Sequence, residues 1–275
     1  MAKSDLLRFQ DARDAYRLIG ECRDLGSDPA LWHGQMFAGL CQLIGVPMVT
    51  GGEGQWLRPH DTVKAVSAFQ AGFDAHAFEL YMAYMRKITP AGDPVFRALQ
   101  RIPGRLVTRT RRQLVHDTEW YRSAIWDDYH RPSKIDDMLV SVYQVSDRGA
   151  VSVICLHRAV GEREFSSRAR RLLSFFHGEL GSLIGHALVS ATEPRPDALA
   201  PRVRQTLACL LEGDSEKQVA SRLGVSQATA HQYVTALYRH FKVTSRAQLM
   251  AHAFGRGAGD RWGFSLAPEE PSGRG

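Results

Sequence analysis

Apolar residues recur at helical spacing in three segments near the start of the chain. The segments are residues 5–25, 27–45 and 74–87. The second has the clearest boundaries, because Asp28 can cap its start, Pro29 suits its first turn and Gly45 can end it. The pattern therefore predicts three helices.

Four other segments are rich in β-branched and aromatic residues, which favour strands. They are residues 46–51, 63–69, 137–145 and 151–159. A short linker from Ser146 to Gly149 joins the last two and suits a hairpin, and a helix is predicted just before them over residues 117–130. Because both faces of these two strands carry apolar side chains, we expect helices on both faces of the sheet, or helices on one face and a ligand or partner on the other.

A long apolar stripe follows the last predicted strand. Its residues are Phe165, Ala169, Leu172, Phe176, Leu180, Leu183 and Ala187. Their intervals of three and four fit an α-helix, so we predict one long helix that covers the sheet. Gly178, Gly181 and Gly185 lie off the stripe, and each weakens a helix by roughly 1 kcal/mol relative to alanine. They suggest close approach of another backbone, and the helix is also a candidate for pairing with its copy in a dimer.

The order of these elements predicts an α+β fold for residues 1–190. This α/β sandwich resembles GAF or PAS domains, and the resemblance implies a sensor or dimerisation domain. Residues 191–198 begin a proline-rich stretch that we interpret as a linker. Residues 255–275 are rich in glycine and proline and are predicted to form a flexible tail.

Residues 199–254 predict a separate, all-α domain of four short helices. Ser215 and Gln218 can form a capping box at the start of the second helix, and Gly224 can end it. A third helix over residues 226–241 follows, with Ser226 placed to cap it. Two short helices joined by a glycine-containing turn make a helix-turn-helix.

The third of these helices has one apolar side and one polar side. The apolar side carries Ala230, Val234, Leu237 and Phe241. The polar side carries Gln227, Ala228, His231, Gln232, Thr235 and Arg239. A side that meets only water usually holds lysine and glutamate, whereas a glutamine can pair with adenine through two hydrogen bonds and does not repel phosphate. The pattern therefore predicts a recognition helix for the major groove.

The segment from Leu199 to Leu249 resembles the LuxR-type helix-turn-helix domain. The resemblance is carried by the opening "LAPR" and by "LLEGDSEKQVASRLGVS", "LYRHF" and "VTSRAQL". It implies a four-helix domain that binds double-stranded DNA, and a fourth helix, over about 245–254, that serves in dimerisation. It implies base contacts by His231, Gln232 and Thr235. It implies phosphate contacts by Lys217, Ser226, Thr229 and Arg239, with Gln227 on the same face.

Four positions depart from the usual pattern of this family. Ala200 stands where Ser or Thr is usual, so the first helix lacks a cap worth about 1 kcal/mol. Val203 replaces a glutamate, His231 a frequent lysine and Tyr233 a frequent histidine. The polar side of the recognition helix is therefore less charged than usual, and we expect weaker phosphate contacts.

Composition agrees with a soluble regulator. The 275 residues are 44% hydrophobic and 23% charged, which is typical of globular proteins, and the formal net charge of +6 permits an anionic partner. No apolar stretch is long enough to span a membrane and no signal peptide begins the chain, so we expect a cytoplasmic protein without membrane contact. The scattered cysteines, none in a C-x-x-C pair, fit reduced thiols.

Two other classes of protein compete with this interpretation. A sigma-factor-like promoter-binding protein has a similar helix-turn-helix, but the "VTSRAQL" helix favours the LuxR type. The second competing class is an N-terminal enzyme or ligand-binding module that carries an accessory DNA-binding domain. Candidates for acid–base or metal chemistry are His116, Asp117, Asp127, Asp128 and His130. Such residues near helix ends more often serve as caps.

A ligand pocket is a stronger expectation than catalysis. Trp120, Tyr121, Trp126 and Tyr129 concentrate aromatic surface close to the central strands, where they could line a site for a small organic molecule or form plain core. We therefore predict a non-enzymatic transcription regulator of LuxR type with no catalytic residue, cofactor or metal. Its expected partners are DNA, a second copy of the chain in a homodimer, an unidentified small-molecule ligand and RNA polymerase.

Overall fold

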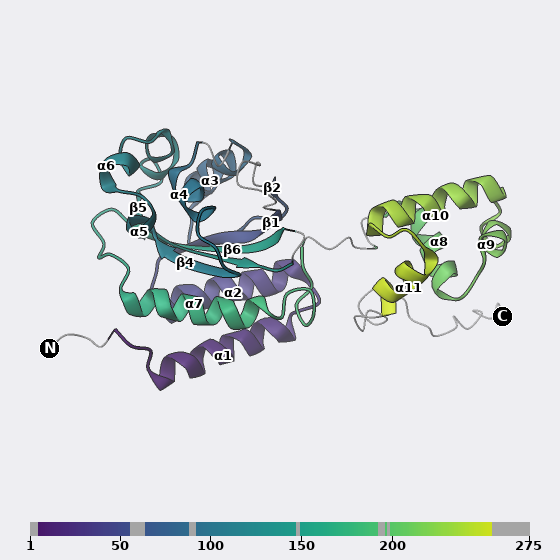
Figure 1. Ribbon diagram of the computed structural model, residues 1–275, viewed down its shortest axis with the longest axis horizontal. Coiled ribbons are helices and arrows are strands. Elements are labelled where there is room, and N and C mark those ends of the chain that lie inside the picture. The colour runs from purple at the N-terminus through teal and green to yellow at the C-terminus, as the bar shows by residue number, and fades with distance from the viewer. Residues whose placement is uncertain are drawn as a thin grey trace, which may run out of the picture. The chain divides into compact units, whose positions relative to one another are not determined.

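The computed structural model describes residues 5–55, 64–87, 92–146, 149–191, 196 and 199–254. The chain divides into two compact units, residues 1–192 and 193–275, and each is described by itself (Figure 1). The predicted tail 255–275 and most of the predicted linker lie outside the described residues. None of the described helices combines the length and the apolar character that crossing a membrane requires.

An antiparallel sheet forms the centre of the N-terminal unit. Its described strands are β1 (Met48–Gln55), β2 (Lys64–Ala65), β3 (Phe69–Ala71), β4 (Leu106–Thr110), β5 (Ile135–Gln144) and β6 (Ala150–Ala159). They lie in the order β2-β1-β6-β5-β4, and β3 also pairs with β1. The predicted pairing of β5 with β6 is confirmed, whereas the strand predicted over 63–69 is two short pieces, β2 and β3.

Helices form two layers on one face of the sheet (Figure 1). α2 (Pro29–Ile44) and α7 (Ser167–Gly181) pack on the strands, and α1 (Phe9–Asp24) packs on both of them. α2 has the predicted boundaries: the Asp28 carboxylate accepts hydrogen bonds from the amides of Ala30 and Leu31, and Gly45 ends the helix in the left-handed conformation. The largest side chains of the core on this face are Trp32, Met36, Phe37, Phe165 and Phe176.

Shorter helices cover the opposite face of the sheet. They are α3 (Ala75–Lys87), α4 (Pro94–Leu99), α5 (Arg111–Leu114), α6 (Asp117–Trp120) and a π-helical turn, η1 (Trp126–His130). The prediction of one helix over 117–130 is wrong, because the Ser123 hydroxyl donates to the carbonyl oxygen of Trp120 and accepts from the amide of Trp126, which breaks the helix. Layers on both faces confirm the predicted α+β sandwich.

α7 is shorter than the apolar stripe predicts. It ends at Gly181, and Gly185 lies beyond it with a φ of 82°. Most of the stripe is buried in the core against the sheet, as the prediction of a covering helix requires. Pairing of this helix with its copy stays a prediction. The close approach indicated by the glycines is to a side chain instead, because a Cβ on Gly181 would stand 2.6 Å from the ring of Tyr143.

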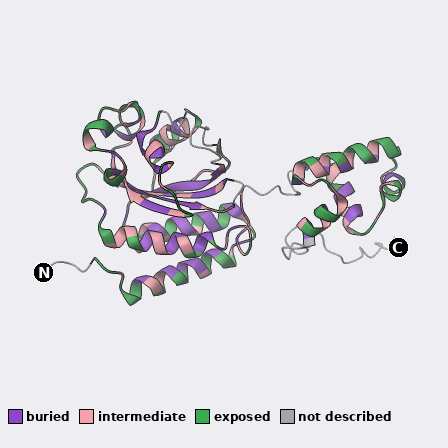
Figure 2. Ribbon diagram, viewed as in Figure 1, coloured by how far each residue is buried: buried purple, intermediate pink, exposed green. Residues whose placement is uncertain are grey.

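The described part of the C-terminal unit is a bundle of four helices. They are α8 (Pro201–Leu211), α9 (Glu216–Leu223), α10 (Gln227–Phe241) and α11 (Arg246–Phe254). The capping box of Ser215 and Gln218, the left-handed Gly224 and the Ser226 cap are all present, so the predicted helix-turn-helix is confirmed. Ala200 provides no side-chain cap for α8. A separate core holds the bundle together (Figure 2).

Candidate nucleic-acid interface and ligand cavity

α10 presents a row of polar side chains on the side that faces away from its core. Its apolar residues are buried against α8 and α9, as their spacing predicts. Gln227, His231, Gln232, Thr235 and Arg239 are exposed, and the same face of α10 is green in Figure 2. α10 contains no aspartate or glutamate. We call this face the polar side of α10; it offers hydrogen-bond donors and acceptors without a negative charge.

The first turn of α10 is held by two hydroxyl groups. The Ser226 oxygen accepts from the amide of Thr229 at 3.1 Å and lies 2.9 Å from the Thr229 hydroxyl. Ser226 is exposed and Thr229 is half-buried. The remaining amides of a first helical turn carry a partial positive charge, so this end of α10 is suited to a phosphate group.

Two basic residues of the bundle, Arg222 and Arg246, have structural roles. Arg222 pairs with Glu212 and with Asp214, where the nitrogen and oxygen lie 2.6 Å apart. Arg246 donates to the carbonyl oxygen of Asp214 at 2.6 Å and so ties α11 to the segment before α9. Lys217 on α9 is exposed. Lys217 is therefore better placed than Arg222 or Arg246 to meet phosphate.

His231 has an acidic neighbour. Its Nδ1 lies 3.1 Å from a carboxylate oxygen of Glu216 at the start of α9. Gln232, the next residue along α10, is exposed. His231 therefore already has a hydrogen-bonding neighbour within the domain. Gln232 is the stronger candidate for contact with a base.

A cavity lies in the N-terminal unit between the sheet and the helices α3, α4 and η1. Strand β1 lines it from Thr50 to Gly54, and β5 and β6 contribute Met138, Val140 and Val153. The other face of the cavity is lined by residues that include Phe73, Tyr81, Tyr84, Met85, Phe96 and Tyr129. Among the described lining residues there is no lysine or arginine. A mainly apolar cavity of this kind suits a small organic molecule.

One carboxyl group in the cavity wall is engaged by its own surroundings. Asp93 caps α4 by accepting from the amides of Val95 at 2.7 Å and Phe96 at 3.1 Å, and the Tyr84 hydroxyl donates to its second oxygen. Burial raises the pKa of Asp93 and also raises the pKa of Tyr84. This pair therefore fixes α3 to α4 at the cavity wall.

Two buried imidazoles also line the cavity. The Nε2 of His157, on β6, lies 2.7 Å from the Thr50 hydroxyl, and His130, in η1, packs edge-on against Trp120 with 4.8 Å between ring centroids. Burial lowers the pKa of His157 to about 3 and that of His130 to about 4, so both are neutral near pH 7. Within the described part of the chain, neither Nδ1 has a hydrogen-bond partner.

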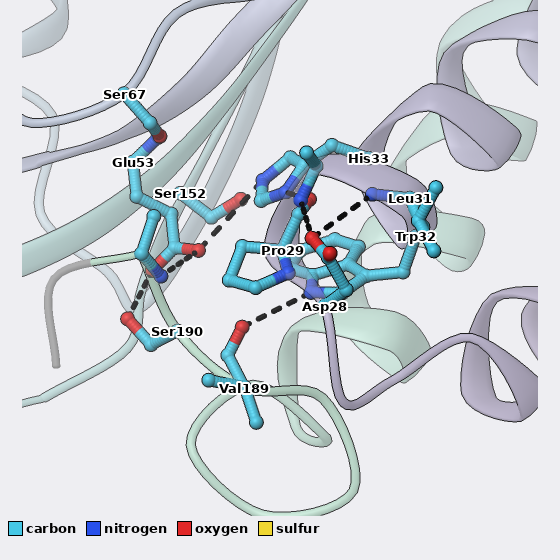
Figure 3. Close-up of polar contacts among 12 residues, drawn as sticks. Asp28, Pro29, Leu31, Trp32, His33, Glu53, Ser67, Ser152, Val189 and Ser190 are labelled. Atoms are coloured by element: carbon cyan, nitrogen blue, oxygen red, sulfur yellow. Dashed lines mark hydrogen bonds and ion pairs between the residues drawn. The ribbon is translucent and has the colours of Figure 1, made fainter. Parts of the chain in front are cut away.

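The opposite side of β1 holds the last described residues of the N-terminal unit (Figure 3). The buried Glu53 carboxylate accepts from the amide of Ala191 at 2.9 Å and from the hydroxyl of Ser190. It lies 3.7 Å from Nε2 of His33 on α2, and burial lowers the pKa of that imidazole to about 4. We call residues 189–191 the exit segment, because the chain continues from them towards the C-terminal unit.

Comparison with known proteins bears on the C-terminal unit. A family model described as bacterial regulatory proteins, luxR family, matches residues 197–253. These residues form a luxR-family DNA-binding domain. Two solved structures are weakly similar to the whole chain. Escherichia coli SdiA is 13% identical, with 89% of this chain and 98% of that chain covered and a TM-score of 0.42. SdiA in complex with octanoyl-rac-glycerol is 12% identical, with 90% and 92% covered and a TM-score of 0.39. No curated protein matches the sequence.

The luxR-family domain contains every residue predicted to contact DNA. These are Lys217, Ser226, Gln227, Thr229, His231, Gln232, Thr235 and Arg239. Lys217 lies on α9, Ser226 caps α10 and the others lie on α10. The fold thus brings together the set that the sequence predicts, and the individual roles of these residues stay predictions.

The four aromatic residues predicted to line a ligand pocket do not form one wall. Tyr129 lines the cavity, whereas Trp120 is fully buried in the core beside it. Tyr121 is 38% exposed and donates to Asp136 at 2.7 Å, and Trp126 packs between Trp120 and Tyr121. Most of this aromatic cluster is therefore core next to the cavity.

Sequence reasoning missed His157 and Asp93 at the cavity. A signal was present for each: His157 stands in a mainly apolar strand, and Asp93 precedes proline just as the cap Asp28 does. Of the residues weighed for catalysis, His116 accepts from the Thr118 amide as a cap and Asp117 pairs with Arg111. The described residues contain no group of three or more side chains suited to a metal ion.

Proposed function

We propose that this protein is a sequence-specific DNA-binding transcription regulator whose N-terminal unit senses a small molecule. α10 lies in the major groove and reads base edges, and the cavity in the N-terminal unit receives the ligand. The observation that carries the proposal is the exposed, acid-free polar side of α10 within a luxR-family domain. As a bacterial regulator it would act in the cytoplasm, where RNA polymerase is a further partner.

The side chains divide into two roles in this proposal. Gln232 and Thr235, with His231, contact bases, because amides, hydroxyls and imidazoles offer directional hydrogen bonds. Lys217, Arg239 and the hydroxyls at the start of α10 contact phosphates, which fix the position of the helix without reading sequence. His231 is shared between this task and its contact with Glu216.

Two substitutions separate these roles once a preferred site has been selected from random duplexes. Gln232→Ala should reduce the preference for that site over random DNA by about 1–3 kcal/mol, because a bidentate base contact is lost. Lys217→Ala should weaken binding to both DNAs about equally and lower the salt dependence by about one phosphate contact. Affinities are measured by fluorescence anisotropy over a range of salt.

Matched controls remove the same chemistry elsewhere. Gln205→Ala removes an exposed glutamine from α8, and Arg163→Ala removes an exposed cation from the N-terminal unit. Neither should change affinity or specificity. The role assignment is wrong if Gln232→Ala and Lys217→Ala lose the same affinity on selected and random DNA.

The proposal also includes dimerisation on DNA. One recognition helix reads only a few base pairs, so two copies on half-sites about one helical turn apart would nearly double the specific contacts. Ala247, Gln248 and Ala251 leave an exposed side on α11, which the family resemblance assigns to this contact. Mass measurement of the protein on its selected duplex should give two chains per duplex, and a single chain would contradict this part of the proposal.

A further inference from the structure

We infer that the cavity binds an uncharged, mainly apolar molecule that carries a hydroxyl group, and that this hydroxyl hydrogen-bonds to the imidazoles of His157 and His130. The inference rests on the proposed function, because it specifies the chemistry of the molecule that the N-terminal unit senses. Three features carry it: the apolar walls, the absence of a cation among the described lining residues, and two buried imidazole nitrogens that have no hydrogen-bond partner within the described part of the chain.

The walls of the cavity select an apolar body. Met138, Val140 and Val153 on the sheet face Phe73 and Phe96 across the cavity, and each presents only hydrocarbon or thioether surface. Transfer of an alkyl or ring system from water into such a site is favourable in proportion to the apolar area removed from water.

The described lining of the cavity offers no counter-charge to an anion. A carboxylate loses its hydration on entry and needs a cation in return, yet no described lining residue is lysine or arginine. The two imidazoles are neutral, since burial lowers the pKa of His157 to about 3 and that of His130 to about 4. Asp93, when ionised, would repel an anion. A fatty acid anion is therefore a poor fit, whereas the corresponding alcohol is not.

The two imidazoles select the polar group. The Thr50 hydroxyl is hydrogen-bonded to Nε2 of His157, and Phe73 packs edge-on against the same imidazole. The Nδ1 of His157 has no hydrogen-bond partner among the described residues, and neither has the Nδ1 of His130. A buried polar atom without a partner is costly, so a ligand group that supplies one gains affinity. A hydroxyl both donates and accepts, and it can therefore bond to either tautomer of each ring.

The charge of the ligand is tested with two probes that share one chain length. Full-length protein is titrated at pH 8 with 1-octanol and with octanoate, and binding is measured by calorimetry. We expect saturable binding of 1-octanol and at least about hundredfold weaker binding of octanoate, because the carboxylate is buried without a cation. Octanoate binding as tightly as 1-octanol would overturn the inference, and so would failure of 1-octanol to bind.

The role of the imidazole is tested with two amide variants. In His157→Asn the amide occupies the place of Nδ1, and in His157→Gln it occupies that of Nε2, next to Thr50. We expect His157→Asn to keep most of the affinity for 1-octanol and His157→Gln to lose about three- to tenfold. The same pair at His130 repeats the comparison if one His157 variant fails to fold. Equal affinities in both members of both pairs would overturn the assignment of the imidazoles.

These measurements are made without DNA. Absence of any preference between selected and random DNA in the unsubstituted protein would defeat the regulator proposal and leave the octanol results unchanged. Conversely, failure of 1-octanol to bind would defeat this inference and leave the DNA measurements intact.

Discussion

Four buried histidines of the N-terminal unit have strongly lowered pKa values. Burial is the largest cause for each, and it brings the pKa to about 4 for His33 and His130 and to about 3 for His157 and His177. In the unfolded chain these imidazoles titrate near pH 6.5. Between these values the unfolded chain binds more protons than the folded one, so protonation favours unfolding.

We therefore predict that the free energy of unfolding falls as the pH falls from about 6.5 to about 4. Each histidine contributes a slope of up to about 1.4 kcal/mol per pH unit in this window. Urea unfolding measured between pH 7.5 and pH 5 gives the slope. His177→Gln, which replaces an imidazole bonded to Ser141 and Ser152, should lower the slope by about one proton. An unchanged slope in this variant would contradict the account.

At the scale of the elements, helix boundaries were predictable because caps are local. Asp28 accepts from amides two and three residues ahead, and Ser215 and Gln218 form their box within a single turn. The break at Ser123 and the end of α7 at Gly181 were not predictable, because serine and glycine also occur inside helices. The ring of Tyr143 beside Gly181 comes from a strand distant in sequence.

The polar side of α10 was predictable for the same reason, since helical spacing alone places its residues together. The cavity was not. The hydrogen-bonded pair His157 and Thr50 comes from two strands, β6 and β1. The two side chains meet because the register of these strands pairs His157 with Met48 and Thr50 with Cys155, two positions away on each strand. That register follows from long-range pairing, which a pattern of apolar residues does not specify.

The missing cap of α8 gives a prediction at this scale. Ala200 is the N-cap residue of α8, and its methyl side chain cannot accept a hydrogen bond. Ala200→Ser should stabilise the C-terminal unit by about 1 kcal/mol, because the new hydroxyl can accept from an amide in the first turn. Thermal unfolding of the full chain measures the change. As a control, Ala208→Ser adds the same hydroxyl inside α8 and should not stabilise; equal stabilisation by both would refute the capping argument.

At the scale of the whole molecule, the exit segment is hydrogen-bonded to three parts of the N-terminal unit. The Glu53 carboxylate on β1 accepts from Ser190 and Ala191. The Trp32 indole on α2 donates to the carbonyl oxygen of Val189 at 3.0 Å. The amide of Val189 donates to the carbonyl oxygen of Gly26, just after α1, at 2.7 Å. The point at which the chain leaves this unit is therefore set by its core.

We predict that Glu53→Ala releases the exit segment while the sheet stays folded. Amide hydrogen exchange at Ala191 should become roughly tenfold faster or more, because its acceptor is lost. Glu53→Gln should have a smaller effect, since the amide oxygen can still accept. Ser67→Ala is the control, because Ser67 accepts from the main-chain amide of Glu53 and not from its carboxylate partners. Unchanged exchange at Ala191 in Glu53→Ala would rule out the anchor.

The position of Glu53 on β1 has a mechanical consequence. The same strand lines the cavity from Thr50 to Gly54. Through the Glu53 carboxylate it also accepts a hydrogen bond from Ala191 in the exit segment. A ligand that displaces this part of β1 would act on Ser190 and Ala191 as well, because the Glu53 carboxylate connects them to the strand. The stiffness of β1 would then determine how much of the displacement caused by a bound ligand reaches the exit segment.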